Sequence, residues 1–187
     1  MQMNPKGARE WQEITKKANQ ENGYIAIVLD DIVYSAPSVR NQPEGMPALT
    51  YLKDRGLTEE TIQTHGFGFA PDKWSALLEH LTRWGATPEL IVQAGLAIPR
   101  KSGQGFYDRF RNRAIIPIRD ESARVVAFGG RILGDGAPKY LNSPESDIYH
   151  KSKVLYGIYF AKQAIAKEDN CYLVEGYTDV IQMSQRG

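Results

Sequence analysis

Two carboxylates near the C-terminus, Glu175 and Asp179, stand where an acid can do chemistry. Glu175 ends the apolar run 171–174, which predicts a buried β-strand, and a glycine follows it directly. In α/β sheets, ligands bind at the carboxyl ends of the strands. A carboxylate there suits a hard cation such as Mg²⁺, or serves as a general base. The alternative is a helix cap, because an acid in the first turn of a helix stabilises its start.

Upstream, arginine recurs at every second position, at Arg109, Arg111 and Arg113, with Phe110 between the first two. Alternate side chains of an extended segment point to one side, so the pattern predicts three guanidiniums on one face and Phe110 in the core. Guanidiniums gathered on one face repel each other unless they bind anions, and their planar forks suit phosphate. The alternative is a solvated or salt-bridged edge strand.

Two further segments place cations beside small or aromatic residues. Two glycines directly precede Arg131, which allows a close backbone approach or a bulge that re-aims the arginine. The stretch 138–144 is predicted to be a loop that can hold a phosphate, stack on a base and bond to its edge. Its residues for these tasks are Lys139, Tyr140 and Asn142. Taken alone, the first segment also fits a plain strand end, and the second a surface turn.

The charge of the chain is concentrated in its middle. The net charge is only +1, which gives no reason to expect a whole-molecule attraction to nucleic acid or membrane. Residues 100–139, however, carry nine basic and four acidic side chains. A basic, aromatic surface leading into an acid at a strand end matches what phosphoryl transfer on a nucleic-acid template requires, namely cations for phosphates and carboxylates for a metal.

Other kinds of site find little support in the sequence. The composition, 42% hydrophobic and 24% charged, is that of an ordinary globular protein. Cys171 is the single cysteine and is expected in the core, so neither a disulfide framework nor a Cys-rich zinc site is expected. The three histidines lack metal-ligand spacing. No apolar run approaches the ~20 residues of a membrane helix and no signal peptide opens the chain, so the expected location is the cytoplasm, with no membrane partner.

The elements that must position these residues alternate between short helices and strands. Hydrophobic spacing and cap residues predict helices at 7–20, 47–55, from Thr58, over 74–84 and from Thr87 to Gly95. Apolar, β-branched runs predict strands at 24–29, 32–35, 66–70, 114–119 and 125–128, the first pair and the last pair forming hairpins. The proline-rich stretch near residue 42 marks a boundary.

The C-terminal part changes to a helix–strand–helix order. The predicted elements are a helix at 154–166, a strand at 171–175 and a helix at 177–185, which together open an α/β sheet. The chain is accordingly divided into residues 1–42, residues 43–166, which hold the basic segments, and residues 167–187.

These motifs are similar, in order and spacing, to the catalytic core of bacterial DnaG-type DNA primases. The resemblance runs from about Glu44 to Gly187. It is carried by the segments 51–57, 66–71, 107–111, 117–119, 128–131, 138–145, 155–157 and 174–180. It implies an α+β fold in which a mixed-sheet basic subdomain leads into an α/β TOPRIM domain, the Mg²⁺-binding module that primases share with topoisomerases.

The resemblance also implies a function and a set of site residues. Such proteins synthesise short RNA primers from ribonucleoside triphosphates on single-stranded DNA during replication, with Mg²⁺ or Mn²⁺ as the cofactor. By motif, Glu175 matches the first TOPRIM acid and is the expected catalytic residue and metal ligand, with Asp179 in the same site. The residues expected to line the DNA and nucleotide groove are Arg55, Arg109, Arg111, Arg131, Lys139, Tyr140 and Asn142.

Several parts of such primases have no counterpart in this sequence. One cysteine cannot supply the zinc-binding domain, and the domain that binds the replicative helicase is absent. TOPRIM is expected to be cut after its first strand and helix, so the metal site is incomplete and the fragment is expected to be inactive alone. The alternatives are a non-catalytic module that binds single-stranded DNA, or another TOPRIM protein.

The first 42 residues differ from what the resemblance predicts. Residues 2–42 look like an extramembrane stretch of the protein-export subunit SecD, through the segments 3–11, 25–30 and 33–37. One interpretation is therefore that the chain is chimeric. The alternative is that a primase core begins with this helix and hairpin of its own.

Overall fold

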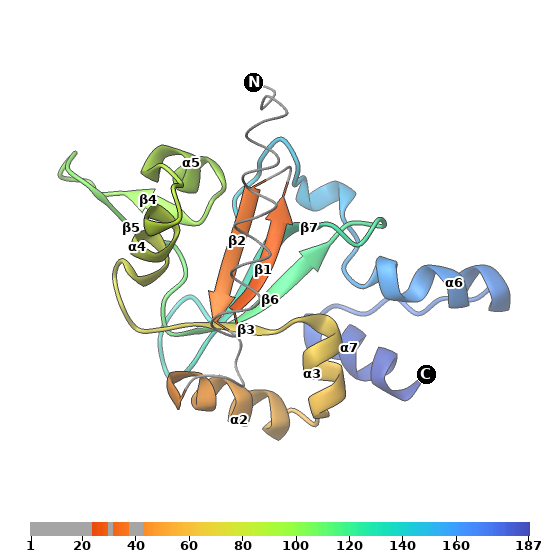
Figure 1. Cartoon of the computed structure of the whole chain (residues 1–187). Helices are drawn as coiled ribbons and strands as arrows, with labels where there is room; N and C mark the ends of the chain where they lie inside the picture. The colour runs from red at the N-terminus through yellow and green to blue at the C-terminus, as the bar shows by residue number, and fades with distance from the viewer. Residues whose placement is uncertain (1–23, 30–31, 38–42) are drawn as a thin grey trace.

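The computed structural model describes residues 24–29, 32–37 and 43–187, with side chains from residue 43 onward. Its centre is a four-stranded sheet made of β3 (Gly68–Ala70), β6 (Arg113–Arg119), β7 (Val125–Ile132) and β8 (Tyr140–Asn142). The strand order is β3-β6-β7-β8, and each neighbouring pair is antiparallel. Helices lie around this sheet, so the predicted α+β class is confirmed (Figure 1).

The hairpin of β6 and β7 is the longest pairing of this sheet and agrees with the sequence prediction. Six consecutive residues of β6 are buried, because both faces of the sheet are covered. Pro117 lacks an N–H group, and it lies beyond the stretch of β6 that pairs with β3. Asp120 closes the turn, since its carboxylate accepts hydrogen bonds from two backbone N–H groups at 2.9 and 3.0 Å.

Each face of the sheet packs against its own hydrophobic core. Along β6, Ile115 belongs to one core and its neighbours Ala114 and Ile116 to the other, as the alternation of a strand requires. The first core is covered by α4 (Ala76–Arg83), α5 (Pro88–Gln93) and the small antiparallel sheet of β4 (Ala97–Pro99) and β5 (Phe106–Asp108). The second is covered by α2 (Met46–Asp54), which follows the short 3-10 helix η1 (Pro43–Gly45), and by α3 (Glu59–His65).

Local signals explain where these helices begin and end. The hydroxyl of Thr58 accepts the N–H of Thr61 at 3.2 Å and starts α3, while Gly66 ends it in the left-handed region at φ 72°. Thr87 caps α5 in the same way, with Pro88 at the first helical position. The helix predicted over 74–84 is shorter than expected, and Trp74 precedes it with 58% of its surface exposed.

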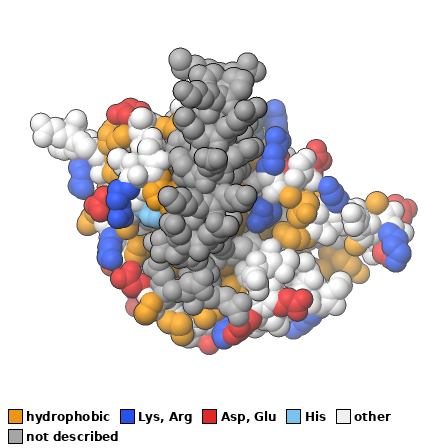
Figure 2. Space-filling model, viewed as in Figure 1, with side chains coloured by type: hydrophobic (Ala, Val, Ile, Leu, Met, Phe, Trp, Pro, Cys, Tyr) orange, Lys and Arg blue, Asp and Glu red, His pale blue; other side chains and the backbone are white. Residues whose placement is uncertain are grey.

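The predicted N-terminal hairpin is present as β1 (Tyr24–Leu29) and β2 (Ile32–Pro37), which pair in antiparallel register. It lies against the central sheet, with β2 close to β3 and β1 close to β7 (Figure 1). The helix predicted at 7–20 lies outside the described residues. On the face seen in Figure 2, the described Lys and Arg side chains are interspersed with Asp and Glu.

The C-terminal part holds the short turn η2 (Lys151–Lys153), α6 (Ile158–Glu168) and α7 (Tyr177–Arg186). The helix α7 is docked firmly: Ile181 is fully buried in the second core, and Gln182 and Gln185 donate to backbone carbonyls after α2 at 2.5 and 2.9 Å. By contrast, α6 has no buried residue and extends from the body of the molecule (Figure 1). None of the described helices is long and apolar enough to cross a membrane.

The strand predicted at 171–175 is wrong. These residues form no strand, and they pair with none of the described ones. Tyr172 and Leu173 are 75% and 82% exposed, and Cys171, predicted to lie in the core, is exposed as well. An apolar run becomes a strand only when a neighbour satisfies its backbone groups, and no described segment offers that edge.

Candidate nucleic-acid interface

Four residues from three elements form what we call the Tyr51 cluster: Tyr51, Arg55, Arg131 and Tyr140. Tyr51 lies on α2, and the guanidinium carbons of Arg55 and Arg131 stand over its ring at 5.5 and 5.3 Å from the centroid. Arg131 on β7 also stands 5.6 Å from the centroid of the Tyr140 ring on β8. Burial, then the neighbouring Tyr51 hydroxyl, raise the pKa of Tyr140, while the two arginines lower it. The cluster unites three predicted site residues through Tyr51, which the motif analysis did not single out as a site residue.

Arg113 lies beside this cluster and is held in place by hydrogen bonds to the backbone. It is buried, and its guanidinium donates to the carbonyls of Gly130 at 3.0 Å and Pro138 at 2.9 Å. Burial, then the charges of Arg111 and Arg131, lower the pKa of Arg113. Arg113 therefore braces the β7–β8 connection and lies within electrostatic reach of guanidiniums on both sides.

The prediction that Arg109, Arg111 and Arg113 share one face is wrong. Asn112 adopts the left-handed region at φ 49°, and its side chain donates to the carbonyl of Leu133 at 2.9 Å. This turn breaks the two-residue alternation between the second and third arginines, so Arg113 leaves the face that Arg111 uses. Arg109 lies apart from both, with its guanidinium at the Asn142 carbonyl. Phe110, as predicted, is buried in the first core.

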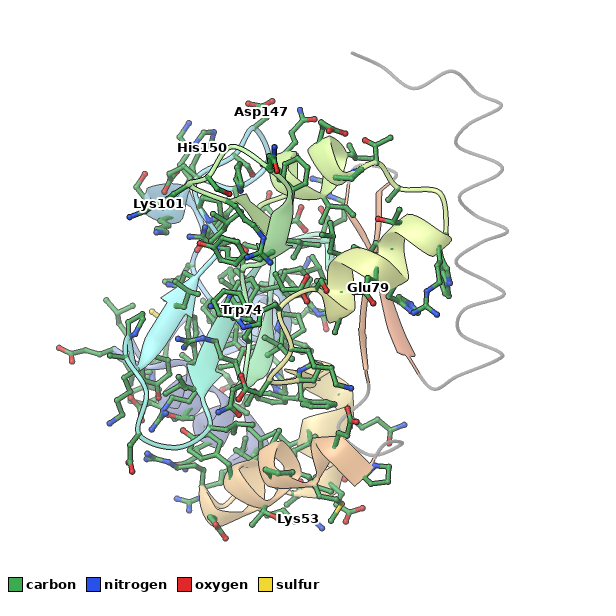
Figure 3. All side chains as sticks on the ribbon, turned by 90° about the vertical axis from the view of Figure 1, so that its left-hand side faces the viewer. Lys53, Trp74, Glu79, Lys101, Asp147 and His150 are labelled. Atoms are coloured by element: carbon green, nitrogen blue, oxygen red, sulfur yellow. The ribbon has the colours of Figure 1, made fainter. Side chains whose placement is uncertain are left out.

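Arg111 belongs instead to a second group, the Trp74 cluster: Trp74, Arg100, Tyr107 and Arg111. The guanidinium of Arg111 stands 4.1 Å from the centroid of the Trp74 ring and 5.1 Å from that of Tyr107. Arg100 stands 5.8 Å from both rings, which meet edge to face at 5.5 Å. In Figure 3, Trp74 lies near the middle of the face toward the viewer, between Lys101 and Lys53. The sequence had placed Trp74 in an amphipathic helix.

Asp108 connects the Trp74 cluster to α4, the helix that covers the first core. Its buried carboxylate accepts the backbone N–H groups of Leu77 at 2.7 Å and Leu78 at 2.9 Å, in the first turn of α4. Its own N–H donates to the carbonyl of Trp74 at 2.8 Å, and Arg111 donates to the Asp108 carbonyl at 2.5 Å. Burial raises the pKa of Asp108, against the helix N–H groups, which lower it. One acid thus fixes both the indole and the guanidinium beside it.

Asn142 connects the cationic surface to the loop that carries Glu175. The Nε of Arg109 donates to the Asn142 carbonyl at 3.3 Å, and the Tyr177 hydroxyl donates to the Asn142 side-chain oxygen at 3.0 Å. Burial lowers the pKa of Arg109. Gly129 leaves the room for this contact, because a Cβ there would stand 2.9 Å from the Tyr177 ring. The predicted role of the glycine pair in a close approach is borne out.

The segment 138–144 is better ordered than the predicted loop. Residues 140–142 are β8, paired with β7 from Gly129 to Arg131. Lys139 and Tyr140 are both exposed, Tyr140 to 42%. The pairing fixes their spacing relative to Arg131, which a free loop would not do.

The two acids near the C-terminus have different roles in the structure. The carboxylate of Asp179 accepts the N–H of Gly176 at 3.1 Å, so it serves as a helix cap at the start of α7. Glu175 is exposed, two residues before the anchored Tyr177. Within the described residues, no group of three or more Asp, Glu, His or Cys side chains could hold a metal ion.

The comparisons with known proteins find DNA primases. A family described as "DNA primase catalytic core, N-terminal domain" matches residues 36–162. The DNA primase of Synechococcus elongatus is 42% identical over 181 residues, which cover 96% of this chain and 26% of that protein.

Solved structures show the same likeness. A DnaG primase catalytic domain bound to single-stranded DNA superposes with a TM-score of 0.71 at 37% identity, covering 97% of this chain and 52% of that one. The RNA polymerase domain of the Mycobacterium tuberculosis primase, in complex with double-stranded DNA, gives 0.75 at 35% identity, covering 96% and 52%. The chain spans about half the length of these solved chains and about a quarter of the Synechococcus protein.

Proposed function

This chain belongs to the DNA primase catalytic-core family, and on that premise we propose that it supplies the surface that holds template and nucleotide in a primase. In the whole protein, the activity would be synthesis of short RNA primers from ribonucleoside triphosphates on single-stranded DNA, in the cytoplasm and beside the replicative helicase. The described residues would bind the polyanion, and residues outside this chain would complete the chemistry.

The observation that carries the proposal is a set of guanidiniums without a carboxylate partner. Among the described residues, the ion pairs join Lys53 to Glu59, Lys73 to Glu44, Arg124 to Asp120, His150 to Glu145 and Lys167 to Glu168. None of them includes Arg55, Arg109, Arg111 or Arg131. These four instead contact aromatic rings or backbone carbonyls, and Arg111 also lies within electrostatic reach of the buried Asp108 carboxylate. Since none of the four is engaged in an ion pair among the described residues, their guanidiniums are available to phosphates.

The aromatic residues suit the other half of a nucleotide. Tyr140 and Trp74 present exposed rings beside guanidiniums, and bases stack on such rings without regard to sequence. Asn142 accepts from Tyr177 through its side-chain oxygen, so its amide N–H groups are free to bond to a base or sugar. Lys139 is exposed beside Tyr140 and would contact the backbone as a point charge.

The described residues do not by themselves fit a Mg²⁺ or Mn²⁺ site, because Glu175 has no described acid cluster around it. Such cations take several oxygen ligands. We propose Glu175 as one ligand of a site that the whole protein would complete with further acids. Asp179, held in the cap of α7, would position this loop.

The division of the chain is also a proposal. Residues 43–166 would form the basic subdomain, and residues 167–187 the beginning of TOPRIM. The likeness of residues 2–42 to SecD stays a prediction. The alternative, a primase-derived N-terminus, is supported by the Synechococcus alignment, because it covers 96% of this chain. Peptide mapping of the protein isolated from its native source would decide between the two.

Two measurements on the 187-residue chain test the proposal. The first is binding of a labelled single-stranded oligonucleotide, followed by fluorescence anisotropy. The second is de novo primer synthesis with ribonucleoside triphosphates and Mg²⁺ or Mn²⁺. We expect binding without synthesis. Primer synthesis that Glu175→Gln abolishes would show that the metal site is already complete in this chain.

The remaining outcomes are equally informative. Binding that Glu175→Gln leaves unchanged agrees with a role of this acid in chemistry rather than in template affinity. Failure of the chain to bind single-stranded DNA at low salt would overturn the proposal. Restoration of synthesis by adding the remainder of a related primase core would separate the fragment of an enzyme from a stand-alone binding module.

A further inference from the structure

We infer that Tyr51 is a positioning residue, whose ring holds the guanidiniums of both Arg55 and Arg131 at the surface that binds phosphate groups. The inference rests on the proposed function, because it assumes that these arginines bind a polyanion. Tyr51 itself is not expected to touch the ligand. It is half-buried at the edge of the second core, whereas Tyr140 opposite it is exposed.

The ring of Tyr51 contacts two guanidiniums. The guanidinium carbons of Arg55 and Arg131 stand 5.5 and 5.3 Å from the same centroid. They come from the end of α2 and from β7, so no shared backbone fixes their separation. The ring is the element that both contact, and Arg131 is held from the other side by Tyr140 at 5.6 Å.

Electrostatics explain why such a holder is needed. Two guanidiniums near one another repel, and neither has a carboxylate partner among the described residues. The negative face of an aromatic ring offsets part of that repulsion without neutralising the charge. A carboxylate in the same place would hold the arginines more tightly, but it would also repel a phosphate. An aromatic holder therefore keeps the pair both ordered and available.

The placement of the Arg131 side chain depends on the two tyrosine rings. Its Nε–H is buried and has no hydrogen-bond partner in the described part of the chain, and its one bond donates to the carbonyl of Ile132 beside it. Its guanidinium also contacts the rings of Tyr51 and Tyr140. Removal of the Tyr51 ring would free Arg131 to turn away from Arg55.

The competing explanation is that Tyr51 merely fills the edge of the core, so the test must separate packing from positioning. A double-mutant cycle does so. Tyr51→Leu keeps apolar volume and removes the ring, Tyr51→Phe keeps the ring and removes the hydroxyl, and each is combined with Arg131→Ala. Denaturant unfolding of each variant checks that it is folded before its affinity for a labelled single-stranded oligonucleotide is measured.

The expected result is a coupled loss. Tyr51→Leu should weaken binding about fivefold with Arg131 present and less than about twofold in the Arg131→Ala background. Tyr51→Phe should stay within about twofold of the parent. In the Arg111→Ala background, where the altered arginine belongs to the Trp74 cluster, the full effect of Tyr51→Leu should persist. Equal losses in both the Arg131 and Arg131→Ala backgrounds would show that Tyr51 acts only through packing, and would overturn the inference.

A measurement without nucleic acid keeps the inference separate from the proposed function. The buried Nε–H of Arg131 gives a resonance that can be assigned by its loss in Arg131→Ala. Its chemical shift should move in Tyr51→Leu and stay in Tyr51→Phe, since ring currents act only while the ring is there. If the parent chain binds no DNA, the proposed function fails while this shift still decides the placement. An unmoved resonance in Tyr51→Leu would overturn the positioning role.

Discussion

The Tyr51 cluster and the Trp74 cluster use the same chemistry, arginine against an aromatic ring, on two different supports. Tyr51 is half-buried and holds its arginines from the side of α2, while Trp74 is mostly exposed and is fixed through the backbone by Asp108. Arg113 lies within electrostatic reach of both, next to Arg131 and Arg111. The difference indicates that the first cluster orders charge and the second offers a surface for stacking.

The largest expected effect comes from breaking the support of the Trp74 cluster. Asp108→Ala removes the acceptor of two helix N–H groups in a buried place, and we expect the free energy of unfolding to fall by about 3 kcal/mol. Asp108→Asn keeps one acceptor and should lose about half as much. Denaturant titration measures both, with the exposed Asp72→Ala as the control, expected within about 0.5 kcal/mol of the parent. A small effect of Asp108→Ala would mean that α4 is held by packing alone.

The helix α3, which packs on the second core with α2, should respond to acid. His65 ends α3, and burial, then the charge of Arg119, lower its pKa to about 4. A lowered folded-state pKa means that the unfolded chain binds the proton more readily, so stability is full above the ordinary value of 6.5 and is lost as pH falls toward 4. Between pH 7.5 and 5 the loss should be about 2 kcal/mol.

The variant His65→Phe keeps a ring against Phe160, whose centroid is 4.3 Å from that of His65, and cannot titrate. Its free energy of unfolding should therefore decline less over the same pH range. Identical pH profiles for His65→Phe and the parent would show that protonation of His65 does not cause the decline in stability.

Trp74→Ala tests whether the second cluster stacks on bases. We expect the affinity for a single-stranded oligonucleotide to fall about tenfold, with the slope of affinity against salt unchanged, because an indole contacts a base and carries no charge. Trp74→Phe should recover most of the loss. A changed slope with either variant would indicate that Trp74 acts by orienting Arg111 and Arg100 instead.

Lys139→Ala should have the smallest effect on affinity and a distinct signature. Loss of one phosphate contact should weaken binding about threefold at moderate salt and reduce the slope against salt by roughly 0.7. The exposed Lys167→Ala, whose side chain pairs with Glu168 on α6, is the control and should change neither quantity. An unchanged slope in Lys139→Ala would remove this residue from the interface.

The sequence predicted elements well wherever a pattern was long and locally complete. The β6–β7 hairpin, the Thr58 cap and the burial of Phe110 followed from alternation and cap chemistry. It failed at Arg113, because one left-handed residue, Asn112, reverses the alternation, and Asn tolerates that region without requiring it. The strand at 171–175 failed because pairing depends on a neighbour that a local pattern does not reveal.

The grouping of the candidate site residues did not follow from the sequence. Arg55, Arg111, Arg131 and Tyr140 were proposed as site residues from the sequence, yet which ring meets which guanidinium depends on contacts between distant elements, such as Tyr51 with Arg131. Tyr51, Trp74 and Tyr107 look like ordinary core aromatics in the sequence. An aromatic residue within a few positions of an arginine, as in Tyr51 and Arg55, is the one signal that could have indicated them.

The most direct test of the central claim is the salt dependence of binding to single-stranded DNA, compared between the parent chain and Arg109→Ala/Arg131→Ala/Lys139→Ala. The account predicts that the parent binds, that the triple variant loses at least about tenfold in affinity at moderate salt, and that its slope falls by roughly 2. Equal affinity and equal slope in two folded proteins would contradict the assignment of this surface to a nucleic acid.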